Sequence, residues 1–253
     1  MTELWNMLLI RPMINSLLFL YNVLGHNFAL SIAVLTVLVR LIILPLTLPQ
    51  LRSSKKMQEL QPQIQAIQKK YKNKEKQTQE LMKLYKEAGV NPMGGCLPLL
   101  IQWPVILAFY QSIAQALADT PLQLLNLAKH IYPSFPALSA LVPLESRFLW
   151  LNLARPDPWY ILPILVVITT WVQQKMVTMP TTDPQSASMT QTMEITMPLM
   201  FGFITMSLAS GLAVYFLVSN VIGIIIQYFV SGWGGLRPQK VGKKPRKRAK
   251  KSR

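Results

Sequence analysis

Five apolar segments, each close to the length of a membrane-crossing helix, constrain this chain most strongly. A hydrocarbon core about 30 Å thick requires roughly 20 apolar residues in an α-helix. The segments cover residues 27–50, 96–118, 158–179, 195–209 and 211–231. Lipid offers no partners to backbone N–H and C=O groups, so spanning segments of this kind must be helical. The sequence predicts an all-α polytopic membrane protein with five transmembrane helices.

Basic residues indicate which loops face the cytoplasm. Of the 26 lysines and arginines, ten fall in residues 51–90 and ten in residues 232–253. The positive-inside rule places both stretches in the cytoplasm, and the even number of segments between them makes the two placements consistent. Residues 119–157 then form a charge-balanced external loop, and residues 180–194 form a short cytoplasmic loop.

The N-terminal residues 3–24 are apolar but interrupted by Asn6, Arg11, Pro12 and Asn15. An amphipathic helix that lies on the outer surface of the membrane fits this pattern best, with the N-terminus outside. A sixth span is the alternative, and it would move only the N-terminus. We expect no cleaved signal peptide, because a basic region and a small-residue cleavage site are missing.

The basic stretch 51–90 is predicted to fold as a cytoplasmic hairpin of two amphipathic helices. Apolar residues recur there at spacings of three and four, from Met57 to Tyr71 and again from Leu81 to Ala88. Pro62 is expected to kink or restart the first helix. A purely structural hairpin is one interpretation, but its charge also suits an anionic partner, such as ribosomal RNA or lipid headgroups. The candidate contact residues are Lys55, Lys56, Lys69 and Lys70.

The C-terminal residues 232–253 form a charge run with no acidic residue. Such a run is expected to be disordered. Its simpler interpretation is a topological signal that also binds anionic lipid. The candidate contact residues in the tail are Lys243, Lys244, Arg246, Lys247 and Arg248.

Arg40 lies near the middle of the first apolar segment, in the run TVLVRLIIL. An arginine at a helix centre costs about 2.5–3.5 kcal/mol on insertion scales, so it normally pairs with an acid or faces water. No segment holds Asp or Glu well inside it, and Glu194 only borders the fourth. Snorkelling is the alternative, but about 15 Å of helix separates Arg40 from Gln50. Arg40 is predicted to face water within the membrane or to await a carboxylate from another molecule.

Polar residues of other segments support a hydrophilic groove that reaches from the cytoplasm to mid-membrane. Asn220 and Gln227 fall on one face of the last segment, because seven residues make nearly two helical turns. Asn220 also lies at about the depth of Arg40. Taken singly, such residues more often make an interhelical hydrogen bond worth about 0.6 kcal/mol. The candidate groove residues are Arg40, Thr36, Thr47, Gln102, Asn220 and Gln227.

Enzymatic and transport functions have less support. HExxH, GxSxG and an embedded aspartate pair are all missing, which argues against an intramembrane hydrolase. We expect no catalytic residues, no metal site and no cofactor, and the lack of a GxxxxGK[ST] loop argues against ATP use. Cys96 is the only cysteine, so no intramolecular disulfide can form. An anion-binding transporter or channel remains the alternative function, although no internal repeat is visible.

Four motifs occur in order along the chain: VLVRLIILPLT around Arg40, Asn91-Pro92 through Gln102-Trp103-Pro104, FLWLNLARPDPWYILPIL at 148–165 and GLAVYFLVSN at 211–220. Together they resemble the YidC/Oxa/Alb family of membrane protein insertases, in its short five-span form. The resemblance covers residues 3–232, and the long outer loop 119–147 departs from compact members.

The resemblance implies a function and a set of partners. Arg40 would match the family's groove arginine and meet an acidic residue in the short translocated tail of a nascent membrane protein. Burial of the substrate's apolar segment in lipid would drive insertion and folding, alone or with the Sec translocon. A translating ribosome, the signal-recognition receptor and anionic lipids are the other implied partners. The implied location is the bacterial plasma (inner) membrane.

Overall fold

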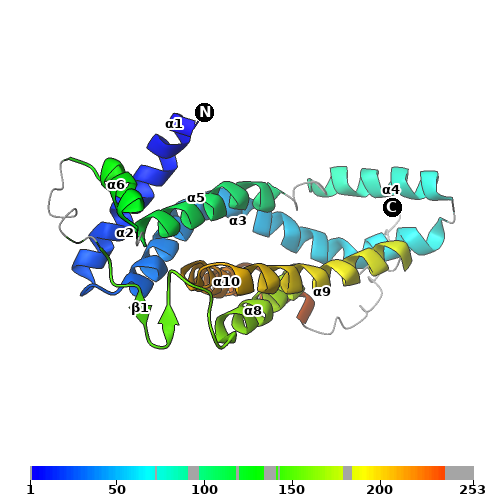
Figure 1. Ribbon diagram of the computed structural model, residues 1–253. Helices are drawn as coiled ribbons and strands as arrows, with labels where there is room; N and C mark the ends of the chain where they lie inside the picture. The colour runs from blue at the N-terminus through cyan, green and yellow to red at the C-terminus, as the bar shows by residue number, and fades with distance from the viewer. Residues whose placement is uncertain are drawn as a thin grey trace, which may run out of the picture.

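The described part of the chain is mostly helical, and its long helices lie side by side (Figure 1). A computed structural model describes residues 2–71, 73–90, 97–117, 120–133, 141, 143–178 and 184–236. The predicted class of all-α polytopic membrane protein is confirmed, whereas the count of five spans stays a prediction. Within the described ranges, three helical stretches are long and apolar enough to cross a membrane, and a fourth apolar helix is shorter. They are Glu3–Val23, Phe28–Lys70 and Ser210–Ser231, with Ile161–Val177 as the shorter one.

Helix α3 (Phe28–Lys70) joins the predicted first span to the first arm of the predicted hairpin without a break. The side chain of Asn27 caps its start by accepting a hydrogen bond from the backbone N–H of Leu30 at 3.0 Å. Because each proline removes only one backbone hydrogen bond, the helix continues through Pro45, Pro49 and Pro62. The end of the first span at residue 50 therefore stays a prediction, and of the two expectations for Pro62 the restart is wrong, because the helix continues through it.

Helix α4 (Lys74–Ala88) completes the predicted helical hairpin by folding back beside the last part of α3 (Figure 1). Asn73 caps its start, because the Asn73 side chain accepts a hydrogen bond from the backbone N–H of Glu75 at 2.8 Å. Gly89 ends it in a left-handed conformation, with φ of +62°. No residue of α4 is buried, so the apolar residues that recur along this helix are only partly covered.

Helix α10 (Ser210–Ser231) lies at the centre of the bundle and packs against α3 and α8 (Ile161–Val177). Its Gly211 lies against Ile32 of α3, and its Ser219 lies against Arg40, each pair being 179 residues apart in sequence. This constant offset means that α3 and α10 run parallel. Close approach through small residues is typical of helix packing in membranes.

Helices α5 (Leu97–Ala116), α8 and α10 coincide closely with three of the predicted spans, whereas α9 is longer than the predicted fourth span. Helix α9 (Pro184–Ser207) begins well before the predicted start at residue 195, so most of the predicted loop 180–194 is helical. Proline suits the first turn of a helix, where its missing N–H would have had no partner. As a result, Glu194 lies within helix α9, one residue before the predicted start of the fourth span.

The two ends of the bundle differ, and we call them the loop end and the tail end. At the loop end, α1 (Thr2–Trp5), the π-helical turn η1 (Asn6–Ile10) and α2 (Arg11–Val23) form one helical run beside α5. The predicted external loop supplies α6 (Pro121–His130) and a small hairpin of β1 (Arg147–Phe148) and β2 (Leu151–Asn152), which the sequence did not predict. At the tail end, η3 (Gly234–Leu236) packs on the end of α8.

Candidate intramembrane groove

Arg40 of α3 points at α10 and binds a neutral partner. Its Nε donates a hydrogen bond to the hydroxyl oxygen of Ser219 at 2.9 Å, and its Nη2 donates to the same oxygen at 2.5 Å. Ser219 is only 2% exposed. Within the described part of the chain, no carboxylate forms an ion pair with Arg40. A hydroxyl orients the guanidinium but leaves its positive charge uncompensated.

A chain of polar side chains holds Ser219 in place. Gln102 of α5 donates its Nε2 to the Tyr215 hydroxyl at 2.6 Å, and that hydroxyl lies beside Ser219, one turn along α10. The Tyr215 ring stacks on Phe109 with the ring centroids 4.3 Å apart. The contacts run from α5 through α10 to α3, so three helices fix the position of the guanidinium. Sequence reasoning selected Gln102 but missed Tyr215 and Ser219, whose spacing of four residues was the available signal.

The two threonines predicted on the face of Arg40 bond to their own helix. Thr36 donates its hydroxyl to the carbonyl of Ile32 at 2.6 Å and is buried. Thr47 donates to the carbonyl of Leu44 at 3.1 Å. Both hydroxyls lie on the side of α3 that holds Arg40, but each donates its hydrogen bond to a carbonyl of α3 itself. They therefore offer a groove acceptor oxygens rather than free donors.

The other two candidates on α10 lie away from the guanidinium contact. Asn220 donates its Nδ2 to the hydroxyls of Thr170 at 2.7 Å and Thr169 at 3.2 Å, both on α8. Consecutive helical residues point about 100° apart, so Ser219 faces α3 while Asn220 faces α8. Gln227 is 1% exposed, and neither of its amide atoms has a hydrogen-bond partner among the described residues.

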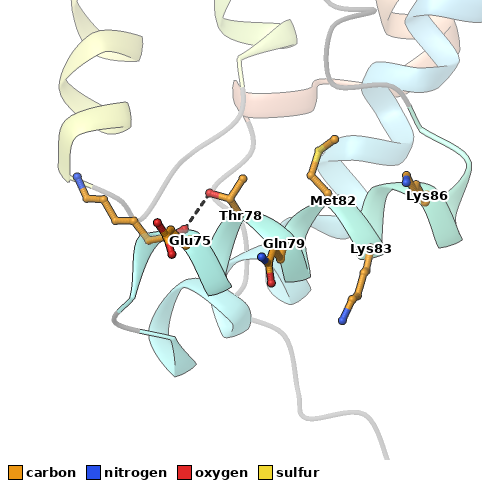
Figure 2. A pocket seen from close by; sticks show the side chains of 7 residues that line it. Glu75, Thr78, Gln79, Met82, Lys83 and Lys86 are labelled. Carbon is orange, nitrogen blue, oxygen red and sulfur yellow. Dashed lines mark hydrogen bonds between the residues drawn. The ribbon is translucent and has the colours of Figure 1, made fainter.

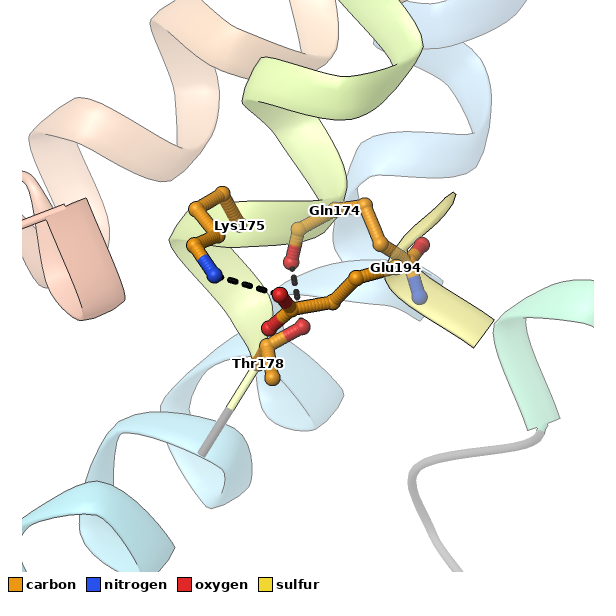
Figure 3. Close-up of polar contacts among 4 residues, drawn as sticks. All are labelled: Gln174, Lys175, Thr178 and Glu194. Atoms are coloured by element: carbon orange, nitrogen blue, oxygen red, sulfur yellow. Dashed lines mark hydrogen bonds and ion pairs between the residues drawn. The ribbon is translucent and has the colours of Figure 1, made fainter. Parts of the chain in front are cut away.

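A second cation in the bundle does have a carboxylate partner (Figure 3). Lys175 near the end of α8 forms an ion pair with Glu194 of α9, whose side chain is 12% exposed. Figure 3 shows Glu194 reaching Lys175 beside Thr178, whose hydroxyl donates to the Gln174 carbonyl at 2.8 Å. Glu194, the acid that the sequence placed closest to a span, is thus already neutralised.

The α3–α4 hairpin presents exposed positive charge. The predicted contact lysines of α3 are all exposed: Lys55, Lys56, Lys69 and Lys70. On α4, a hydrogen bond from Lys83 to the Glu80 carboxylate raises the pKa of the lysine. An open hollow of about 640 Å³ runs along α4 (Figure 2), and its lining is Lys74, Glu75, Thr78, Gln79, Met82, Lys83 and Lys86. The predicted tail contacts Lys243, Lys244, Arg246, Lys247 and Arg248 lie outside the described residues.

The end of α8 anchors both the hairpin and the start of the tail. Gln58 of α3 donates its Nε2 to the carbonyls of Met176 at 3.1 Å and Val177 at 3.3 Å. Gly234 has a φ of +48°, and a Cβ atom there would lie 2.1 Å from the Met176 carbonyl oxygen. Only glycine permits this approach, so the tail leaves the bundle from a fixed point.

These features define a polytopic helical membrane protein with a positive charge held between its spans. Residues 19–234 match the model of a family described as 60Kd inner membrane protein. Membrane protein insertase YidC 2 of Bacillus anthracis is 34% identical over 238 residues, which cover 91% of this chain and 82% of the relative. Membrane protein insertase MisCA of Bacillus subtilis is 34% identical over 248 residues, which cover 95% and 85%.

A crystal structure of an active YidC insertase with the first transmembrane domain resolved is also similar. It matches with a TM-score of 0.57 and 31% identity over 83% of this chain. The chain spans less than half of that structure, with 43% of the other chain covered. The chain belongs to the bacterial family of YidC membrane protein insertases and is an inner-membrane protein.

Proposed function

We propose that this protein inserts newly made membrane proteins into the bilayer and assists their folding through a hydrophilic groove beside Arg40. The observation that carries the proposal is the neutral partner of Arg40. Because Ser219 brings no negative charge, a substrate carboxylate can pair with the guanidinium without displacing a resident acid. The names of the relatives, which describe membrane protein insertases, support the same function.

Two free-energy terms govern the proposed insertion: the cost of moving a carboxylate into the membrane and the gain from burying an apolar segment in lipid. A carboxylate carried into the membrane costs about 2.5–3.5 kcal/mol on insertion scales, and pairing with Arg40 reduces that penalty. Burial of the substrate's apolar segment supplies the driving force, at about 25 cal/mol per Å² of apolar surface. The substrates of this route are nascent membrane proteins with short acidic translocated tails.

The proposed orientation places the tail end in the cytoplasm and the loop end outside. The exposed lysines of the hairpin, with the basic tail, then face a translating ribosome and anionic lipids. The Sec translocon and the signal-recognition receptor are the proposed delivery partners. The sequence has no GxxxxGK[ST] loop, and the proposed route draws its energy from burial of the substrate in lipid rather than from ATP.

The test compares Arg40→Ala and Arg40→Lys with the unmodified protein in liposomes. Loss of the charge should lower insertion of substrates with an acidic tail by about tenfold, since about 1.4 kcal/mol is lost. Arg40→Lys should retain part of the activity, because an ammonium keeps the charge but lacks the planar fork. Substrates with neutral tails are the control and should be inserted equally by all three proteins. Equal insertion of acidic tails by Arg40→Ala would contradict the groove.

A second test addresses the basic surface. Deletion of residues 238–253 should lower ribosome co-sedimentation at moderate salt by a few-fold, because phosphate contacts weaken steeply as ionic strength rises. Thermal unfolding should not change, since the deletion leaves η3 on the end of α8. If co-sedimentation is unchanged, the tail contacts only lipid.

A further inference from the structure

Helix α6, in the loop end, packs on the N-terminal helical run through one buried face. Thr120 and Gln123 form a capping box that starts the helix. On its inner side, Leu127 is fully buried against Ile10 and Ile14 of that run. The capping box therefore fixes where α6 starts, and the burial of Leu127 fixes its second half against the N-terminal run.

Asn15 of α2 holds the other end of α6. Its Nδ2 donates to the carbonyl of His130 at 2.9 Å, and its Oδ1 accepts from the backbone N–H of Tyr132 at 2.9 Å. Asn15 is 6% exposed, so the two bonds are shielded from water. This clamp ties the last turn of α6 to α2 and sets which side of α6 faces outward.

The outward side of α6 is apolar in its first half and polar in its last turn. Leu122 is 70% exposed and Leu125 is 62% exposed. Lys129, one turn beyond Leu125, is also exposed. In water the two leucines would leave a bare apolar surface, which proteins usually cover.

The N-terminal helical run offers a matching apolar surface at the same end of the bundle. Leu4 is 65% exposed, Met7 61% and Leu8 62%, and Arg11 is exposed one turn further along. Two neighbouring helices thus share one pattern, with apolar side chains followed by a cation. Helices that lie in a lipid interface bury leucines among acyl chains and leave cations at the phosphates.

We propose that α6 is an interfacial helix, which inserts Leu122 and Leu125 into the lipid leaflet at the loop end. Lys129 then lies at the headgroup phosphates. The lipid is chosen over a protein partner because two neighbouring helices at the loop end both expose apolar side chains and because an exposed cation follows each set one turn later. The assignment of this leaflet as the outer one rests on the proposed orientation, but burial in lipid can be measured without any insertion activity.

The experiment uses the full chain with its only cysteine, Cys96, replaced by serine. Leu122→Cys and Leu125→Cys variants carry an environment-sensitive fluorophore, and Lys129→Cys is the matched control. The protein is reconstituted in phosphatidylcholine–phosphatidylglycerol vesicles that contain lipid spin-labelled either at the headgroup or within the acyl chain. All three sites are exposed, so labelling should leave the packing of α6 intact.

Acyl-chain spin labels should quench the probes at 122 and 125 by about twofold, whereas the probe at 129 should respond mainly to headgroup labels and to aqueous iodide. Iodide quenching at 122 and 125 without acyl-chain quenching would overturn the proposal, because both leucines would then lie in water. A blue-shifted probe that neither quencher reaches would overturn it as well, because a protein surface would then cover the helix. Neither outcome depends on insertion activity, so failure here is distinguishable from failure of the groove.

Discussion

Arg40 and Lys175 are both cations held between helices of one bundle, yet their partners differ. Lys175 of α8 faces the carboxylate of Glu194 on α9, and the two charges cancel. Arg40 of α3 faces the hydroxyl of Ser219 on α10, which leaves its charge intact. The first arrangement ties two helices together, and the second orients a charge that remains free to bind an anion.

The difference shows that a charge inside a membrane bundle is not functional merely because it is there. The charge of Lys175 is already compensated by Glu194, so a substrate carboxylate would have to compete with Glu194 to bind the lysine. At Arg40 no competitor exists among the described residues. The position of a cation along a helix does not tell whether it is paired or free. The side chain that faces it decides this.

Removing the acid of the paired site should produce the greatest loss of stability. Glu194→Gln leaves Lys175 without a counter-charge, and because the lysine side chain is 34% exposed we expect about 1–3 kcal/mol rather than the full penalty of a buried pair. Thermal unfolding in lipid nanodiscs measures the effect. The double variant Lys175→Met with Glu194→Met should recover most of the loss. Unchanged stability in Glu194→Gln would mean that the pair does not hold α8 to α9.

Introducing an acid at the unpaired site should convert it to the paired kind. Ser219→Asp places a carboxylate where Arg40 already donates two hydrogen bonds. Insertion of substrates with acidic tails should fall about fivefold, because the internal acid competes for the guanidinium, while stability is kept or raised. Ser219→Asn is the neutral control of similar size. If Ser219→Asp inserts acidic tails as well as Ser219→Asn does, the free charge of Arg40 is not what substrates use.

The sequence revealed the parts of this comparison that depend on local composition. Apolar blocks located most of the bundle helices, because lipid requires a continuous helix of apolar residues. Arg40 stood out because a charge in such a block is rare. Helical spacing also predicted the hairpin of α3 and α4, because its apolar residues recur every three to four positions.

What the sequence missed depends on contacts between distant segments. The partner of Arg40 is 179 residues away, and no local pattern distinguishes Ser219 from Asn220 as the residue that faces α3. The sequence also left open whether Pro62 kinks or restarts its helix, and the helix continues through it, since a proline removes only one backbone hydrogen bond. The sequence also did not show that α9 starts at Pro184, because the polar residues between Pro184 and Glu194 resemble a loop. Glu194 therefore lies within a helix.

The smallest effects should separate the two amides of α10 that the sequence grouped together. Asn220→Leu removes two hydrogen bonds to α8 and should lower stability by about 1 kcal/mol. Gln227→Leu replaces a buried amide that has no partner among the described residues, so stability should stay the same or rise by up to about 1 kcal/mol. Both changes are to leucine and both sites are buried, so each is the control for the other in one thermal-unfolding series. A clear loss in Gln227→Leu would show that its amide is satisfied by water or by a residue outside the described ranges.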